Sequence, residues 1–285
     1  MRSIFVSFKK LIKSTRQRLQ SVVETYKYFF RKVPEIDSGI GKGLRFDVGR
    51  GTKFFISGQY ERPVQDMIES LVKPSDVCYD IGANLGFFSV LLGRLVGSTG
   101  MVYAFEPVPE NAAMIEKNAQ LNHFNNIQVL RIACSRRSNR SELLLAHHIG
   151  GAVLKNAGVP PDFSGEKILV KTSSLDLLVE SHQIMPPDLV KIDVEGAELD
   201  VLMSMENILK KWEPIVIVEV DDAIQSKCEE KLLLCREYLH GLCYQTNILP
   251  NSYSDKIWFV RHFCAIKEGS SRVFVEFAEH KTTDC

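Results

Sequence analysis

Three charged residues, Lys191, Asp193 and Glu195, occupy every second position across the end of the apolar run "LVKIDV". Side chains two positions apart point to one face of an extended chain, so the three would share a face at the end of a buried strand. Because burying unpaired charges is costly, we expect a partner or a chemical role. A carboxylate held there can take the proton of an alcohol, which contributes about 10²–10⁴-fold to a rate. We predict Asp193 as general base and Glu195 as second candidate, with Lys191 pairing with either and keeping it ionised.

Two other interpretations of these carboxylates stay open. Asp193, Glu195 and Glu219, which lies in "VIVEV", could converge on a hard cation that prefers oxygen ligands. No further acidic or amide neighbour completes a tight octahedral set, so a metal ion is not favoured and no metal ligand is assigned. The structural interpretation pairs Lys191 with Asp193 and lets Glu195 and Glu198 cap the next helix, where acids interact well with the helix dipole.

A second constellation lies in "YDIGANLGFF", where Asp80, Gly82, Asn84 and Gly86 stand between a strand and a helix. Glycines permit a tight turn and a close approach of a ligand to the backbone. Amides at the start of the following helix then face that ligand. Glu106 ends the next strand, where an acid can accept hydrogen bonds from both hydroxyls of a ribose. The pattern predicts a nucleoside-containing cofactor beyond the carboxyl ends of the strands.

The residue types in this turn favour S-adenosylmethionine over NAD. Dinucleotide sites usually have G-x-G-x-x-G, whose second glycine admits the pyrophosphate. Asn84 stands at that place, where a side chain crowds a diphosphate but can contact an amino-acid tail. Asp80 before the turn suits an ammonium group. A nicotinamide-dependent oxidoreductase, or glycines that serve only strand–helix packing, remain the alternatives.

Strand-like and helix-like segments alternate from about residue 72. This alternation predicts parallel pairing and an open sheet covered by helices on both faces. The expected strands are 76–82, 101–107, 127–133, 189–194, 215–220, 243–249 and 256–263, and the expected helices are 87–96, 109–122, 197–209 and 223–240.

The motifs D-x-G-A-N-x-G, F-E-P and K-I-D-V-E-G, in this order, resemble those of FkbM-family methyltransferases. The likeness runs from about residue 56 to 220 and more weakly to 263. It implies a Class I Rossmann-like sheet, mostly parallel with an antiparallel last strand, S-adenosylmethionine as cofactor, and O-methylation. By this resemblance the turn residues line the methionine part of the cofactor and Glu106 holds its ribose, while Ile132 and Ala133 lie near the adenine.

Charge is distributed unevenly along the chain. Residues 1–32 hold nine Lys/Arg and one acid, whereas the remainder holds 26 basic and 34 acidic residues. We predict a basic amphipathic helical extension over 1–45, followed by a methyltransferase domain over 46–285 with an insertion at about 136–172. The extension could cap the domain, lie on a membrane surface or be an organelle-targeting segment. His147 and His148 in the insertion are further candidates for substrate contact.

The remaining composition bounds the function. The chain has no apolar run of about 18 residues, and its seven cysteines lack C-x-x-C spacing, which favours a reducing, intracellular location, cytoplasmic or peripheral to a membrane. Basic residues after the extension are scattered, so nucleic acid is not the expected substrate. We predict an O-methyltransferase that acts on a hydroxyl of a small molecule, sugar or lipid-linked glycan. A non-catalytic binding protein of the same fold is the alternative.

Overall fold

The computed structural model describes residues 33–49, 54–146, 152–155, 163–253 and 258–274. The chain divides into two units, Met1–Pro34 and Glu35–Cys285. The basic segment 1–32 and the pair His147 and His148 lie outside the described residues, and so do the predictions made for them. Ile36, Ile40 and Leu44, which the sequence analysis assigned to the extension, are buried in the core of the second unit.

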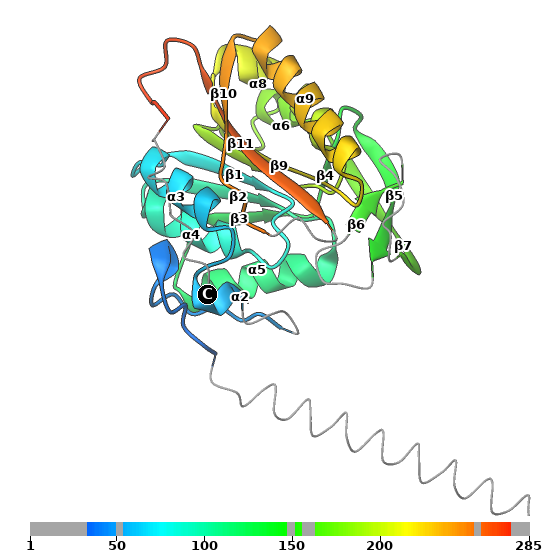
Figure 1. Cartoon of the computed structure of the whole chain (residues 1–285). Helices are drawn as coiled ribbons and strands as arrows, with labels where there is room; N and C mark the ends of the chain where they lie inside the picture. Colours follow the sequence, from blue (N-terminus) through cyan, green and yellow to red (C-terminus); the bar gives the residue numbers. More distant parts are fainter. Residues whose placement is uncertain (1–32, 50–53, 147–151, 156–162, 254–257, 275–285) are drawn as a thin grey trace, which may run out of the picture. The chain divides into compact units, whose positions relative to one another are not determined.

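Among the described residues, seven strands form one sheet in the order β10-β11-β9-β8-β1-β2-β3. The five from β9 to β3 are parallel to one another, and β11 runs antiparallel to β9 and β10. This confirms the predicted open α/β sheet with an antiparallel last strand (Figure 1). The strands are β1 Val77–Ile81, β2 Met101–Phe105, β3 Ile127–Leu130, β8 Leu189–Ile192, β9 Ile215–Asp222, β10 Tyr244–Ile248 and β11 Phe259–Lys267.

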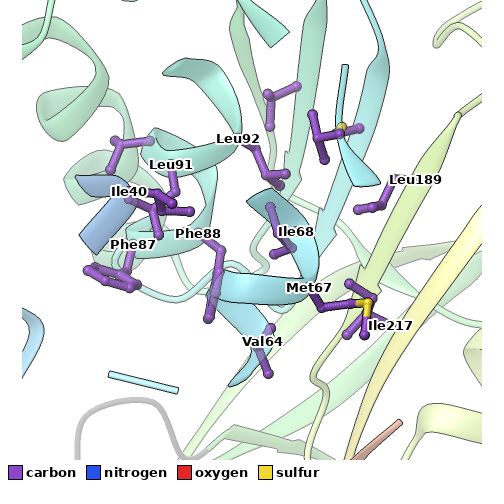
Figure 2. Close-up of a cluster of buried hydrophobic side chains, with 14 of the residues drawn as sticks. Ile40, Val64, Met67, Ile68, Phe87, Phe88, Leu91, Leu92, Leu189 and Ile217 are labelled. Atoms are coloured by element: carbon purple, nitrogen blue, oxygen red, sulfur yellow. The ribbon is translucent and has the colours of Figure 1, made fainter. Parts of the chain in front are cut away.

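Helices cover both faces of this sheet because its strands are apolar on both faces. Cys78 and Leu189 belong to the buried cluster that includes α3 and α4, whereas their neighbours Tyr79 and Val190 belong to the cluster of the α6–α9 side. Figure 2 shows α3 and α4 side chains packed toward Leu189 and Ile217. The helices are η1 Gly39–Gly41, α2 Phe54–Ser57, α3 Arg62–Leu71, α4 Phe87–Val96, α5 Pro109–Leu121, α6 Leu175–Glu180, α7 Glu198–Met203, α8 Glu206–Lys211 and α9 Gln225–Gly241. None of these helices combines the length and apolarity that crossing a membrane demands.

One expected helix is divided in two. The sequence analysis predicted a single helix over 197–209, but α7 ends at Met203 and α8 begins at Glu206. The carbonyl of Ser204 accepts hydrogen bonds from the Asp176 backbone N–H at 3.0 Å and the Ser174 hydroxyl at 2.9 Å. The Asp176 carboxylate in turn accepts from the backbone N–H groups of the first turn of α8. Contacts with α6 therefore override the local helical pattern.

The segment that interrupts the strand–helix rhythm contributes to a second sheet, in the order β4-β7-β5-β6. Strand β5 pairs antiparallel with both β6 and β7. Val108 and Ala133 form a small apolar cluster with Leu143, Leu154 and Val170 of this sheet. The strands are β4 Ala133–Cys134, β5 Asn139–Ala146, β6 Ala152–Leu154 and β7 Phe163–Ser173.

Candidate functional site

A cavity of about 580 Å³ lies against the carboxyl ends of the parallel strands, where open α/β sheets bind ligands. Its volume falls in the usual range for small-molecule sites. Eight of the residues that line it, all named from the sequence except Asp221, fall into two sets. We call Gly82, Asn84, Glu106 and Ala133 the turn group, and Asp193, Glu195, Glu219 and Asp221 the acidic group. Ile132 lines the cavity too, whereas Asp80, Gly86 and Lys191 do not.

Gly82 connects the two groups through its backbone. It has a φ of +81°, and a Cβ at this position would lie 1.7 Å from the carbonyl oxygen of Asp193. Only glycine fits so close an approach. The Asp193 backbone N–H also bonds the carbonyl of Ile81 at 3.0 Å. The turn after β1 and the residue after β8 are therefore held against each other.

Glu106 joins the end of β2 to the turn after β1. Its two carboxylate oxygens accept hydrogen bonds from the backbone N–H groups of Asn84, at 2.9 Å, and Val108, at 2.8 Å. Burial raises the pKa of Glu106 to about 7, against the lowering effect of these two bonds. Asn84 is itself in the left-handed conformation, with φ +50°. Its buried Oδ1 has no hydrogen-bond partner, so the turn presents an unused acceptor.

Asp80 and Gly86 support the turn from behind the cavity. Asp80 is 1% exposed, and its Oδ2 accepts a hydrogen bond of 2.6 Å from the Ser89 hydroxyl in α4. Burial raises the pKa of Asp80. A Cβ on Gly86 would lie 3.0 Å from Ile115 of α5, so this glycine allows close packing of the turn on that helix. Neither residue lines the cavity itself, so any role of theirs toward a cofactor stays a prediction.

Lys191 and Asp193 form the pair that the sequence analysis expected. The buried Lys191 Nζ lies 2.9 Å from Asp193 Oδ2 and 4.6 Å from the centre of the Phe88 ring. Burial alone would lower the pKa of Lys191, but the charges of Asp193 and Glu61 raise it above its ordinary value. Lys191 is therefore a buried ammonium group that holds the Asp193 carboxylate in a fixed orientation.

Glu195 does not share a face with this pair. Strand β8 ends at Ile192, and Glu195 adopts a left-handed conformation with φ +52°. Its carboxyl group forms a hydrogen bond with Asp221, which also accepts from Trp258 Nε1 at 2.6 Å. Burial and the nearby Asp221 charge raise the pKa of Glu195 to about 10. The Glu195–Asp221 pair therefore retains a proton at neutral pH, which makes Glu195 poorly suited as a base.

Glu219 belongs to a third arrangement. His262 Nε2 of β11 lies 2.5 Å from Glu219 Oε2 and 3.5 Å from Glu61 Oε2, and the Tyr253 hydroxyl donates to Glu61 Oε1 at 2.8 Å. Burial alone would lower the pKa of His262, but Glu219 and Glu61 raise it to about 10. Burial and the Asp193 charge raise the pKa of Glu219 to about 8. The His262–Glu219 pair therefore retains a proton at neutral pH.

The charged side chains that line the cavity are all carboxylic acids among the described residues: Glu106 and the acidic group. Lys191 and His262 lie behind this wall, 2% exposed each. Like charges that share a site raise one another's pKa, and an opposite charge relieves them. A cavity of this kind favours a ligand with a positive charge, such as a sulfonium or ammonium group.

Sequence reasoning missed Glu61, His262, Asp221 and Trp258 as parts of the site. Tyr60 and Glu61 carried a signal, because they belong to the upstream segment that resembles the FkbM family. His262 carried another, since it interrupts the apolar run "FVRHFCAI" of β11.

Comparison with known proteins places these residues in a family context. The family model of the methyltransferase FkbM domain matches residues 80–245. The chain is 30% identical over 175 residues to the hexuronic acid methyltransferase AglP of Haloferax volcanii, covering 60% of this chain and 68% of that relative. It is 29% identical over 180 residues to the 31-O-demethyl-FK506 methyltransferase FkbM of Streptomyces tacrolimicus, covering 53% and 67%. A solved FkbM methyltransferase from Methylobacillus flagellatus aligns with a TM-score of 0.47 at 16% identity, over 71% of this chain and 50% of that chain.

Proposed function

Because the chain belongs to the FkbM methyltransferase domain family, we propose that it transfers a methyl group from S-adenosylmethionine to a hydroxyl of a small molecule, sugar or lipid-linked glycan. The observation that carries this proposal is the single cavity lined by both groups. On one side, this cavity offers hydrogen-bond acceptors for a nucleoside. On the other side, it offers carboxylates that suit a positively charged group and can accept the proton of a hydroxyl.

The turn group fits the cofactor by its unused hydrogen-bonding capacity. The buried Oδ1 of Asn84 needs a donor, which the ammonium of a methionine tail supplies. The Glu106 carboxylate accepts two backbone hydrogen bonds and one from the Asn111 side chain, which leaves it a lone pair for a ribose hydroxyl. Ala133 and Ile132 would border the adenine with apolar surface. When bound, the cofactor supplies an electrophilic methyl carbon.

The acidic group would serve the hydroxyl that receives the methyl group. Asp193 is the residue we propose as general base, since its carboxylate lines the cavity while Lys191 fixes one of its oxygens. Glu195 and Asp221 share a hydrogen bond and would border the acceptor as an acid pair. Alignment of the reacting atoms supplies much of the acceleration, about 7–11 kcal/mol in favourable cases. The base adds about 10²–10⁴-fold.

Calorimetry and product release test the two parts of this proposal separately. Titration of the full-length chain should show S-adenosylmethionine binding, and absence of binding to the wild type would refute the proposal. Denaturing mass analysis of small molecules that co-purify with the chain gives an independent check of the cofactor. Release of S-adenosylhomocysteine in the presence of sugar, lipid-linked or small-molecule alcohols then separates an enzyme from a binding protein of the same fold.

A further inference from the structure

Three side chains of types that can bind a metal ion, none of them in the turn group, come together beside the cavity. One ligand atom from each of Glu61, Glu219 and His262 lies within 4.8 Å of the other two. The set considered from sequence for a cation was a different one: Asp193, Glu195 and Glu219. The structure separates that set, because Asp193 bonds Lys191 and Glu195 bonds Asp221.

Distant parts of the chain supply the three residues. His262 of β11 and Glu219 of β9 are direct partners across the antiparallel pair, so the sheet register sets them opposite each other. Glu61 precedes α3 in a left-handed conformation, with φ +46°. A non-glycine residue in this conformation costs about 1–3 kcal/mol and persists only where its surroundings hold it. The Tyr253 hydroxyl fixes one Glu61 oxygen, which leaves the other directed at His262.

The second Glu61 oxygen lacks the hydrogen bond that burial demands. Glu61 is 1% exposed, and its Oε2 has no hydrogen-bond partner. It lies 3.5 Å from His262 Nε2, beyond normal hydrogen-bond length. This oxygen forms an ion pair with His262 but accepts no hydrogen bond, which is costly for a buried carboxylate. This oxygen lies nearest His262 Nε2, the same atom that contacts Glu219 Oε2.

We propose that Glu61, Glu219 and His262 bind one divalent transition-metal ion at the wall of the cavity. Two carboxylate oxygens and one imidazole nitrogen suit manganese, iron(II) or zinc better than magnesium or calcium, which prefer all-oxygen sites. A divalent ion balances both carboxylates when the imidazole is neutral. Bonds of about 2.0–2.2 Å to such an ion span ligand atoms up to about 4 Å apart, so small side-chain rotations complete the site.

The position of the ion gives it a role, and that role rests on the proposed function. Of the three ligands only Glu219 lines the cavity, as Tyr253 does, so an acceptor would reach the ion on the Glu219 side. An acceptor hydroxyl bound there meets a positive ion in a wall otherwise lined by carboxylic acids. A metal ion there would lower the pKa of a bound hydroxyl, whose proton would pass to Asp193, and the oxygen would take the methyl carbon while the sulfonium leaves as a thioether.

Metal titration of the full-length chain tests the site without any acceptor. After chelator treatment, Mn²⁺ binding is measured by electron paramagnetic resonance and Zn²⁺ binding by calorimetry. The wild type should bind one ion, and Glu61→Gln and His262→Gln should weaken it on the order of 100-fold. The control variants Glu195→Gln and Asp221→Asn alter the neighbouring acid pair and should bind Mn²⁺ as the wild type does.

Two results overturn the metal site: no saturable binding to the wild type up to about 1 mM ion, or wild-type affinity in Glu61→Gln. If both ligand variants fail to fold, Mn²⁺ broadening of histidine ring signals in the wild type decides. One imidazole should broaden at low Mn²⁺, and uniform or absent broadening contradicts the site. Calorimetry with S-adenosylmethionine on the same samples keeps a failed metal site distinct from a failed methyltransferase assignment.

Discussion

The turn group and the acidic group line one cavity but are held in different ways. Backbone N–H groups orient Glu106, and a backbone contact with Asp193 fixes Gly82. In the acidic group, side chains hold side chains: Lys191 holds Asp193, Asp221 holds Glu195 and His262 holds Glu219. Backbone-held positions tolerate few residue types, whereas side-chain pairs can be replaced together. On the proposed function, the first group would hold the cofactor and the second the acceptor.

Gly82→Ala should have the largest effect, because it breaks the contact between the two groups. The added Cβ would meet the Asp193 carbonyl at 1.7 Å. We expect a loss of about 3 kcal/mol or more in the free energy of unfolding, together with loss of cofactor binding. Gly43→Ala is the matched control, since Gly43 has a φ of +79° and no atom within 4 Å of its Cβ position. It should cost about 1–2 kcal/mol. Equal chemical-denaturation curves for both variants would contradict the argument.

Asp193→Asn should leave the turn group intact and damage the reaction. We expect turnover to fall about 10²–10⁴-fold while S-adenosylmethionine affinity stays within a few-fold of the wild type. Glu195→Gln serves as the comparison, because the Glu195–Asp221 pair already holds a proton at neutral pH and the amide retains a donor. Its turnover should fall about tenfold or less. Steady-state rates of S-adenosylhomocysteine release rank the two, and the reverse order would assign the base to Glu195.

Glu106→Ala should damage cofactor binding more than any replacement in the acidic group. Hydrogen bonds to a charged group contribute about 1.5–3 kcal/mol, which corresponds to a loss of about 10–100-fold in S-adenosylmethionine affinity. Calorimetry measures this directly. Glu110→Ala is a suitable control, because this acid lies in the first turn of α5 and is exposed. A wild-type dissociation constant in Glu106→Ala would remove this residue from the cofactor site.

The pH dependence of cofactor binding gives the smallest and most specific test. The pKa of Glu106 is raised from 4.5 to about 7 by burial, and ribose hydroxyls donate best to its ionised form. Affinity should therefore rise as the pH increases through about 7, and fall up to tenfold for each pH unit below it. Binding near the pKa should release a proton, which calorimetry in buffers of different ionisation enthalpy detects. Glu106→Gln should flatten this profile, and an unchanged profile would assign the titration to another group.

The contrast between the two groups also explains what could be predicted from sequence. The turn after β1 and Glu106 follow strands with clear apolar patterns, and short-range geometry fixes their place. Two features could not be predicted in this way: the left-handed turn at Glu195 and the cross-strand pairing of His262 with Glu219. Both depend on how β9 and β11 are placed in the sheet, and no local sequence pattern sets the register between these strands. Lys191, Asp193 and Glu195 were expected to share one face of a strand, but β8 ends at Ile192, so the alternation does not continue to Glu195.

The second sheet has a consequence for how such proteins diversify. Leu143, Ala152 and Leu154 of β5 and β6 give the cavity apolar surface, and they come from one contiguous stretch between β4 and β7. Strand β4 contributes Ala133 and Cys134 to the same wall. Grafting this stretch from another family member would reshape the pocket while leaving the central strands untouched. A chimera could thus acquire a new alcohol preference in one genetic exchange.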